Sequence, residues 1–104
     1  MITFTELLER AKTEEIAIHT PTEKQAKALL KALDEKGYEW FSGNKLTTIT
    51  RYENHKENTC YDFSIGIDGK LVFKKVMYSS LSFYQEEGYT IIEFSDINFK
   101  ESNL

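Results

Sequence analysis

One amphipathic helix with its own start and stop signals constrains this chain more than any other feature. A capping box that runs from Thr20 to Glu23 opens the segment, and Pro21 suits the first helical position because its missing N–H would have no partner there. Gly37 follows the last turn, and glycine readily adopts the left-handed conformation of a helix end. The pattern predicts a helix over residues 21–36.

One face of this helix is apolar and the opposite face is charged. The apolar residues recur at helical spacing and are Ala26, Leu29, Leu30 and Leu33. A helix of this kind buries its apolar face against a second layer. A chain of 104 residues has room for one such core, so we expect a single α+β domain over residues 1–99 and a frayed tail over 100–104.

A second capping box, formed by Thr3 and Glu6, precedes a short apolar series and predicts a helix over residues 3–12. A helix of about ten residues is marginal on its own in water. We therefore expect this helix to pack beside the longer one or to cover an edge of a sheet.

Short β-prone segments alternate with the helices. They are predicted at residues 15–19, 38–41, 61–67, 71–78 and 89–94. Together with the helices they predict a two-layer α+β sandwich, in which a sheet of four to five mostly antiparallel strands packs against the long helix. Residues 45–52 are also β-prone, and residues 79–88 are expected to be a connector with one helical turn.

The dipeptide Asp68-Gly69 is a strong signal for the tight turn of a hairpin. The register of that hairpin stays open at this stage. A two-residue loop places Ile65 opposite Val72, whereas a three-residue bulged loop places it opposite Phe73. The two registers put opposite faces of the second strand on the core.

The expected core combines the apolar faces of the long helix and of the strands. Its predicted members are Ile16, Ile18, Ala26, Leu29, Leu30, Leu33, Trp40, Phe63, Ile65, Phe73, Ile91 and Phe94.

Composition excludes several classes of partner. The chain has 17 acidic and 13 basic residues and a formal net charge of −4, which argues against duplex DNA or anionic lipid as the main partner. No apolar run approaches the roughly 20 residues that cross a bilayer. The first twelve residues lack the pattern of a signal peptide, so we expect a cytoplasmic protein without membrane contact.

Reactive residue types are scarce. A single cysteine, Cys60, excludes an intramolecular disulfide and a cysteine-based zinc site. A hydrolase or transferase built on Cys60 and His55 is one hypothesis, but we favour Cys60 as a small buried hydrophobe and His55 as a solvated loop residue. No phosphate-binding loop or hydrolase motif occurs. We therefore expect a protein that is not an enzyme, with no catalytic residue, metal site or cofactor.

The favoured function is binding to another protein. Between residues 81 and 104 the chain has five acidic side chains and one lysine, and such a patch could accelerate association with a basic surface, for example that of a nucleic-acid-binding protein. The expected partner-binding residues are Tyr84, Glu86, Glu87, Glu93 and Asp96. A homodimer is compatible with the same surface.

The alternative function is a small-molecule or nucleotide-binding module. The chain has 13% aromatic residues, and three of them could line a pocket between sheet and helix. These residues are Tyr38, Trp40 and Tyr61.

Two segments carry a resemblance to a known group of proteins. Residues 37–43 read GYEWFSG, and residues 89–97 read YTIIEFSDI. This pattern, GYxWxSG followed by YxIIxFxDI, resembles small accessory proteins encoded by phages and prophages of Gram-positive bacteria, most of them of unknown function. Some small acidic proteins from that setting, including anti-CRISPR proteins, inhibit host defence by binding protein. The resemblance thus implies a host protein as the partner, such as a CRISPR-Cas protein, and it assigns no functional residues.

Overall fold

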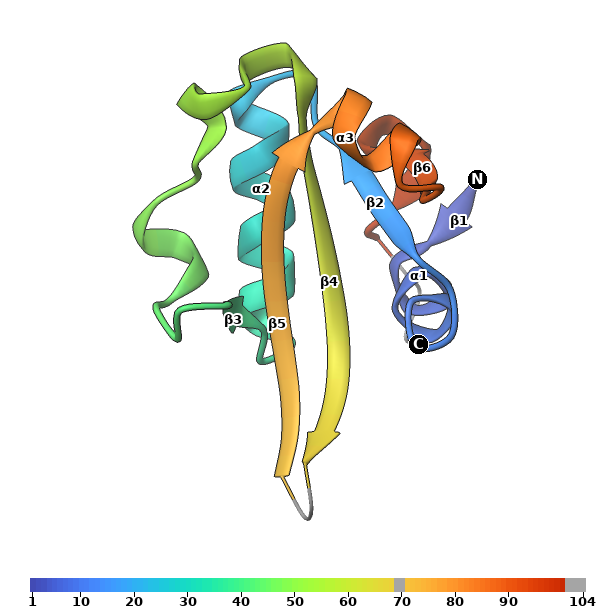
Figure 1. Ribbon diagram of the computed structural model, residues 1–104, viewed down its shortest axis with the longest axis vertical. Helices are drawn as coiled ribbons and strands as arrows, with labels where there is room; N and C mark the ends of the chain where they lie inside the picture. Colours follow the sequence, from blue (N-terminus) through green and yellow to red (C-terminus); the bar gives the residue numbers. More distant parts are fainter. Residues whose placement is uncertain (69–70, 101–104) are drawn as a thin grey trace.

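The computed structural model describes the backbone of residues 1–68 and 71–100, and the side chains of these residues outside 64–73 (Figure 1). In this part of the chain, five strands form one sheet in the order β3–β5–β4–β2–β6. The strands are β2 (Ile16–His19), β3 (Glu39–Trp40), β4 (Thr59–Asp68), β5 (Leu71–Ser80) and β6 (Thr90–Glu93). The expected α+β architecture is confirmed.

The sheet is mixed. Among the described residues, β4 pairs antiparallel with β2 and with β5, whereas β3 pairs parallel with β5 and β6 pairs parallel with β2. It follows that β4 alone runs against the other four strands. A helix at Glu23–Glu35 connects β2 to β3, and a helix at Leu81–Glu86 connects β5 to β6, and each helical crossover returns the chain in the same direction.

Helix α2 (Glu23–Glu35) covers one face of the sheet (Figure 1). It begins two residues later than predicted, because the capping box is formed by Thr22 and Gln25. The Thr22 hydroxyl accepts from the Gln25 N–H at 3.2 Å, and the Gln25 side chain accepts from the Thr22 N–H at 3.3 Å. The Thr20 hydroxyl is buried and donates to the Thr59 carbonyl at 3.2 Å, so it holds β4 and cannot cap the helix.

Helix α1 (Phe4–Arg10) begins at the predicted capping box, in which Thr3 and Glu6 exchange hydrogen bonds of 3.0 and 3.1 Å. A second sheet that the sequence did not indicate lies beside it. There β1 (Ile2–Thr3) pairs parallel with β7 (Ile97–Asn98). This pairing and the contact of the Phe4 and Phe99 rings, 5.0 Å apart, fasten α1 to the C-terminal segment.

The remaining connections are short helical turns. Helix α3 (Leu81–Glu86) packs on the face of the sheet opposite α2, where Tyr84 contacts Ala17 and Cys60. The 3₁₀ turns are η1 (Leu46–Thr48), η2 (Tyr52–Asn54), η3 (Lys56–Asn58) and η4 (Phe94–Asp96). Three of these turns form the long connection from β3 to β4 that passes beside α2 (Figure 1).

The register of the β4–β5 hairpin differs from both predicted alternatives. Asp68 pairs with Leu71, so Ile65 lies opposite Lys74 rather than opposite Val72 or Phe73. The antiparallel ladder continues through Asp68, which makes that residue the end of the strand and not part of the turn. Residues 69 and 70, including the predicted turn residue Gly69, lie outside the described residues.

Most of the predicted core is buried. The confirmed members are Ile16, Ile18, Ala26, Leu29, Leu30, Leu33, Trp40 and Phe63. Ile91 is only partly buried because β6 lies at an edge of the sheet, and Phe94 is partly buried in the turn η4 that follows β6. The side chains of Ile65 and Phe73 are outside the described set. The same core also contains Phe4, Leu7, Tyr38, Leu46, Tyr61, Val76 and Ile97.

Replacing Leu33 with alanine should lower the free energy of unfolding by about 2–5 kcal/mol, since Leu33 is fully buried between α2 and the sheet. Urea denaturation followed by circular dichroism measures the change. Lys24→Ala on the exposed face of α2 is the control and should stay within about 0.5 kcal/mol of wild type. Equal effects of the two substitutions would contradict the packing described here.

Candidate functional site

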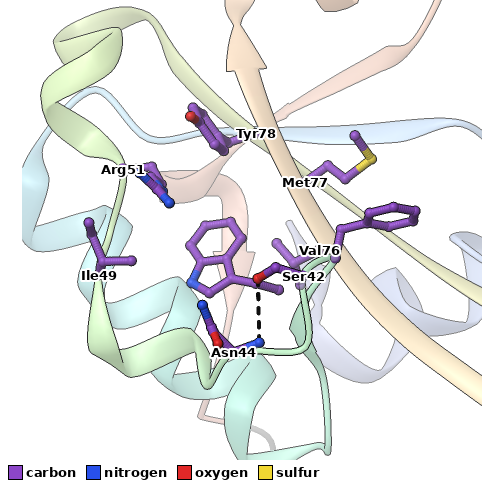
Figure 2. Close-up of a pocket in the computed structure, with 9 residues that line it drawn as sticks. Ser42, Asn44, Ile49, Arg51, Val76, Met77 and Tyr78 are labelled. Carbon is purple, nitrogen blue, oxygen red and sulfur yellow. Dashed lines mark hydrogen bonds between the residues drawn. The ribbon is translucent and has the colours of Figure 1, made fainter.

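A cavity of about 180 Å³ opens beside β3 and β5 at one edge of the sheet (Figure 2). Ile49 and Arg51 come from the connection on one side of the cavity, and Val76 and Met77 come from β5 on the other. The complete lining is Trp40, Phe41, Ser42, Asn44, Ile49, Arg51, Val76, Met77 and Tyr78.

A tight turn after β3 builds one wall of this cavity. Gly43 has a φ of 96°, a conformation that glycine adopts without strain, and its N–H donates to the Trp40 carbonyl at 2.7 Å. The Trp40 N–H then donates to the Asn44 carbonyl at 3.0 Å, and the Phe41 N–H donates to Val76 at 3.1 Å. The turn therefore folds back along β3 and keeps Phe41 against β5.

Trp40 lines the cavity from the core side. Its side chain is 6% exposed, and its ring meets the Tyr78 ring at 81° with centroids 6.0 Å apart. Among the described residues, its indole Nε1 is the one buried side-chain nitrogen or oxygen without a hydrogen-bond partner. Leaving such a donor unpaired costs about 1–3 kcal/mol, so an acceptor that reaches it would stabilise a complex.

The rim of the cavity is apolar and exposed. Phe41 is 69% exposed, Met77 is 50% exposed and Ile49 is 39% exposed. Single exposed apolar residues are ordinary on protein surfaces, but a contiguous group around a cavity is typical of an interaction site. Phe83 is also 46% exposed and is not part of this group.

Arg51 lines the cavity with a strained backbone. Its φ of 62° lies in the left-handed region, which is uncommon for residues other than glycine. Both neighbours are held: the Thr50 carbonyl accepts from the Tyr61 hydroxyl at 2.5 Å, and the Tyr52 hydroxyl donates to the Pro21 carbonyl at 2.6 Å. Strain that surrounding contacts maintain is characteristic of functional positions.

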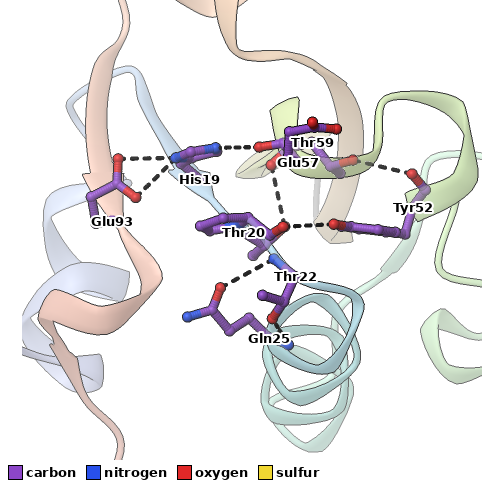
Figure 3. A network of polar contacts seen from close by, with 9 residues as sticks. His19, Thr20, Thr22, Gln25, Tyr52, Glu57, Thr59 and Glu93 are labelled. Carbon is purple, nitrogen blue, oxygen red and sulfur yellow. Dashed lines mark hydrogen bonds and ion pairs between the residues drawn. The ribbon is translucent and has the colours of Figure 1, made fainter.

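A polar network joins β2, β6 and the turn before β4 (Figure 3). The His19 Nδ1 lies 2.9 and 3.0 Å from the two carboxylate oxygens of Glu93, and its Nε2 lies 2.7 Å from the Glu57 carbonyl. Both ring nitrogens thus face oxygen atoms, one pair from a side chain and one from the backbone. This network fixes the end of the sheet, with the Glu93 side chain 45% exposed.

The structure distributes the predicted partner-binding residues among different roles. Glu86, Glu87 and Asp96 are exposed. Glu93 is engaged with His19. Tyr84 is 2% exposed and therefore not part of an accessible surface, because it fills the space between α3 and the sheet.

The Tyr84 hydroxyl donates to Asp62 at 2.9 Å. Burial is the main cause that raises the pKa of Tyr84, and the nearby Asp62 charge adds to it. This hydroxyl therefore stays neutral and serves as a structural donor.

Of the residues predicted for an aromatic pocket, only Trp40 lines the cavity. Tyr38 and Tyr61 are buried in the core, where Tyr38 meets the Phe63 ring at 87°. The cavity lies at the edge of the sheet, and its members Ile49, Arg51 and Met77 were missed by sequence reasoning. The alternation of inward and outward residues along β5 could have identified Met77 as an exposed residue. No local sequence signal identifies Ile49 or Arg51.

Cys60 is fully buried between the sheet and α3. Burial raises the pKa of its thiol to about 12, with a smaller contribution from the Glu93 charge. The His55 ring contacts Tyr78 instead, with centroids 6.0 Å apart. These surroundings oppose a nucleophilic role for Cys60. Within residues 1–68 and 71–100, no group of three or more histidine, cysteine and acidic side chains is placed to hold a metal ion.

Comparison with protein-family models, curated proteins and solved structures found no match to this chain. In the described ranges, no helix has the length and apolarity needed to cross a bilayer.

Cys60 in the folded protein should react with iodoacetamide at neutral pH far more slowly than a free thiol, because its pKa of about 12 leaves almost no thiolate. Mass spectrometry of timed samples measures the modified fraction. The urea-unfolded protein is the control and should react at the rate of a model thiol. Rapid labelling of the native state would contradict the buried position.

Glu93→Gln should lower the free energy of unfolding by about 1–2 kcal/mol, since it removes the charged acceptor of His19 in a half-buried setting. Asp96→Asn, an exposed acid-to-amide change nearby in the sequence, should be close to neutral. Parallel thermal and urea denaturation measures both variants. No difference between them would show that the His19–Glu93 pair contributes nothing to folding.

Proposed function

We propose that this protein is a non-enzymatic binding protein that docks another protein through the Trp40 patch. We define the Trp40 patch as the cavity with its exposed rim, namely Trp40, Phe41, Ile49, Arg51, Met77 and Tyr78. In this proposal one apolar side chain of the partner enters the cavity, and the rim closes around it.

The size of the cavity carries this proposal. Its volume is about 180 Å³. Drug-sized ligands occupy sites of roughly 300–1,000 Å³, whereas a cavity of about 150 Å³ accommodates a benzene ring. The volume therefore suits one large side chain better than a nucleotide. This comparison favours a side chain over a nucleotide as the occupant of this cavity.

The residue types of the Trp40 patch support the same conclusion. Trp, Tyr, Phe, Met and Arg are the types enriched at protein interfaces, and all five occur here. A partner that also presents a hydrogen-bond acceptor could satisfy the unpaired Trp40 N–H, provided that the groups covering the nitrogen shift on binding. Residues of this kind, central and desolvated, are typical of binding hot spots.

The partner proposed from the sequence is a bacterial host protein. The resemblance of residues 37–43 and 89–97 to small phage and prophage proteins supports an inhibitor that covers a functional surface of a host defence protein. The exposed acids Glu86, Glu87 and Asp96 would assist long-range association with a partner that is basic outside the contact area.

A double substitution, Phe41→Ala with Met77→Ala, should abolish capture of the partner while the fold is retained. Both side chains are at least half exposed, so their removal takes away contact area without opening the core. The experiment is a quantitative pull-down from lysate of a Gram-positive host, with isotope-labelled samples for wild type and variant.

Phe83→Ala is the matched control, because Phe83 is an exposed aromatic residue outside the Trp40 patch. A partner should be enriched by wild type and by this control alike, and lost with the double variant. Trp40 is the only tryptophan of this chain, so binding of the purified partner should also change the intrinsic fluorescence that Trp40 contributes. Capture that is insensitive to the double variant would refute docking at this site.

A further inference from the structure

A second cavity adjoins the Trp40 patch. It has a volume of about 380 Å³ and lies between α2 and the connection that contains η1. Ile49 lines both cavities, which lie on the two sides of this connection, and we refer to the two cavities together as the groove. The lining of the second cavity is Glu23, Lys27, Leu30, Lys31, Leu46, Thr47, Thr48, Ile49 and Thr50.

The residues that line this groove have a positive net charge, whereas the whole chain has a negative one. Its charged residues are Lys27, Lys31 and Arg51 on the basic side and Glu23 on the acidic side. The chain as a whole has a formal net charge of −4. Among the described residues, none of the three cations forms an ion pair, whereas Lys12, Lys45 and Lys75 do.

We propose that this groove binds an acidic amphipathic segment of a partner protein. The inference rests on the proposed function, and it adds the chemistry of the bound segment. An apolar side chain enters the Trp40 cavity, while carboxylates on the same segment reach Arg51 at one end and Lys27 and Lys31 at the other.

The spacing of the two lysines fits such a segment. Lys27 and Lys31 are four residues apart on α2, so they project from the same side of the helix about 5–6 Å apart at Cβ. Carboxylates two residues apart on an extended segment, or four apart on a helical one, have a similar separation. Ile49, which is 39% exposed, supplies apolar surface beside these cations.

The groove is a poor match for a nucleic acid. Single-strand binders stack bases on exposed aromatic rings and follow the backbone with many cations. Here Trp40 is 6% exposed, so Phe41 is the one mostly exposed aromatic ring of the groove, and three cations are few for a phosphate backbone. Carboxylates beside an apolar anchor are the chemistry that these residues fit.

A selection from random peptides displayed on phage tests this inference. Peptides selected on wild-type protein should combine an apolar anchor with acidic residues, and a fluorescent copy should bind with an affinity that falls as salt rises. The variant Lys27→Glu, Lys31→Glu, Arg51→Glu should bind that peptide about tenfold or more weakly. Circular dichroism melting confirms that each variant is folded.

The matched control reverses three cations outside the groove, Lys12, Lys36 and Lys100, each to glutamate. This control changes the net charge by the same amount, so it should bind the peptide nearly as well as wild type. An equal loss with both triple variants would show a general charge effect and overturn the inference.

The remaining outcomes separate the two proposals. Selection of neutral or basic peptides that lose binding with Phe41→Ala, Met77→Ala would overturn the acidic-segment inference and leave docking at the Trp40 patch intact. Failure to select any peptide that this double variant weakens would count against both. Tight binding of an oligothymidine strand that the groove triple variant abolishes would assign the groove to nucleic acid instead.

Discussion

The contact between α2 and the sheet determines where every other element of this protein can lie. Leu29, Leu30 and Leu33 are removed from water only because β2, β4 and β5 provide an apolar face beneath them. Strand β3 has only two residues, of which Trp40 belongs to that face, so the sheet ends abruptly beside Trp40. The Trp40 patch is thus a consequence of a short edge strand: the core is closed by one indole ring, and the outer side of that closure remains open to a partner.

Sequence patterns that span one or two helical turns predicted the elements that depend on interactions between neighbouring residues. The Thr3 capping box and the leucine face of α2 were visible in the sequence because both depend on residues within one or two helical turns. The start of α2 differs from the prediction because Thr20 and Thr22 are both suitable N-cap residues. Only the buried hydrogen bond from Thr20 to Thr59 decides between them. The hairpin register was predicted wrongly for a related reason. The alternation of apolar and polar residues is the same whether Asp68 ends the strand or begins the turn.

The candidate site was predicted less well than the fold. Trp40 could be singled out as a large aromatic residue, but Ile49 and Arg51 belong to a segment that was recognised only as β-prone. The segment instead contains η1, and hydrogen bonds to Thr50 and from Tyr52 hold it against the core and Pro21. Tertiary contacts between distant residues therefore create both the strained Arg51 and the groove, and no sequence window contains those contacts.

The small parallel sheet at the other side of the molecule has a practical consequence. Because β1 pairs with β7, Ile2 lies beside Ile97, and the first and last strands of the described chain lie side by side on the side of β6, away from β3 (Figure 1). A short linker could therefore join these ends, and new ends could be opened elsewhere without disturbing the sheet. A solid support or a fluorescent fusion attached at either end would likewise leave the opposite edge of the protein accessible.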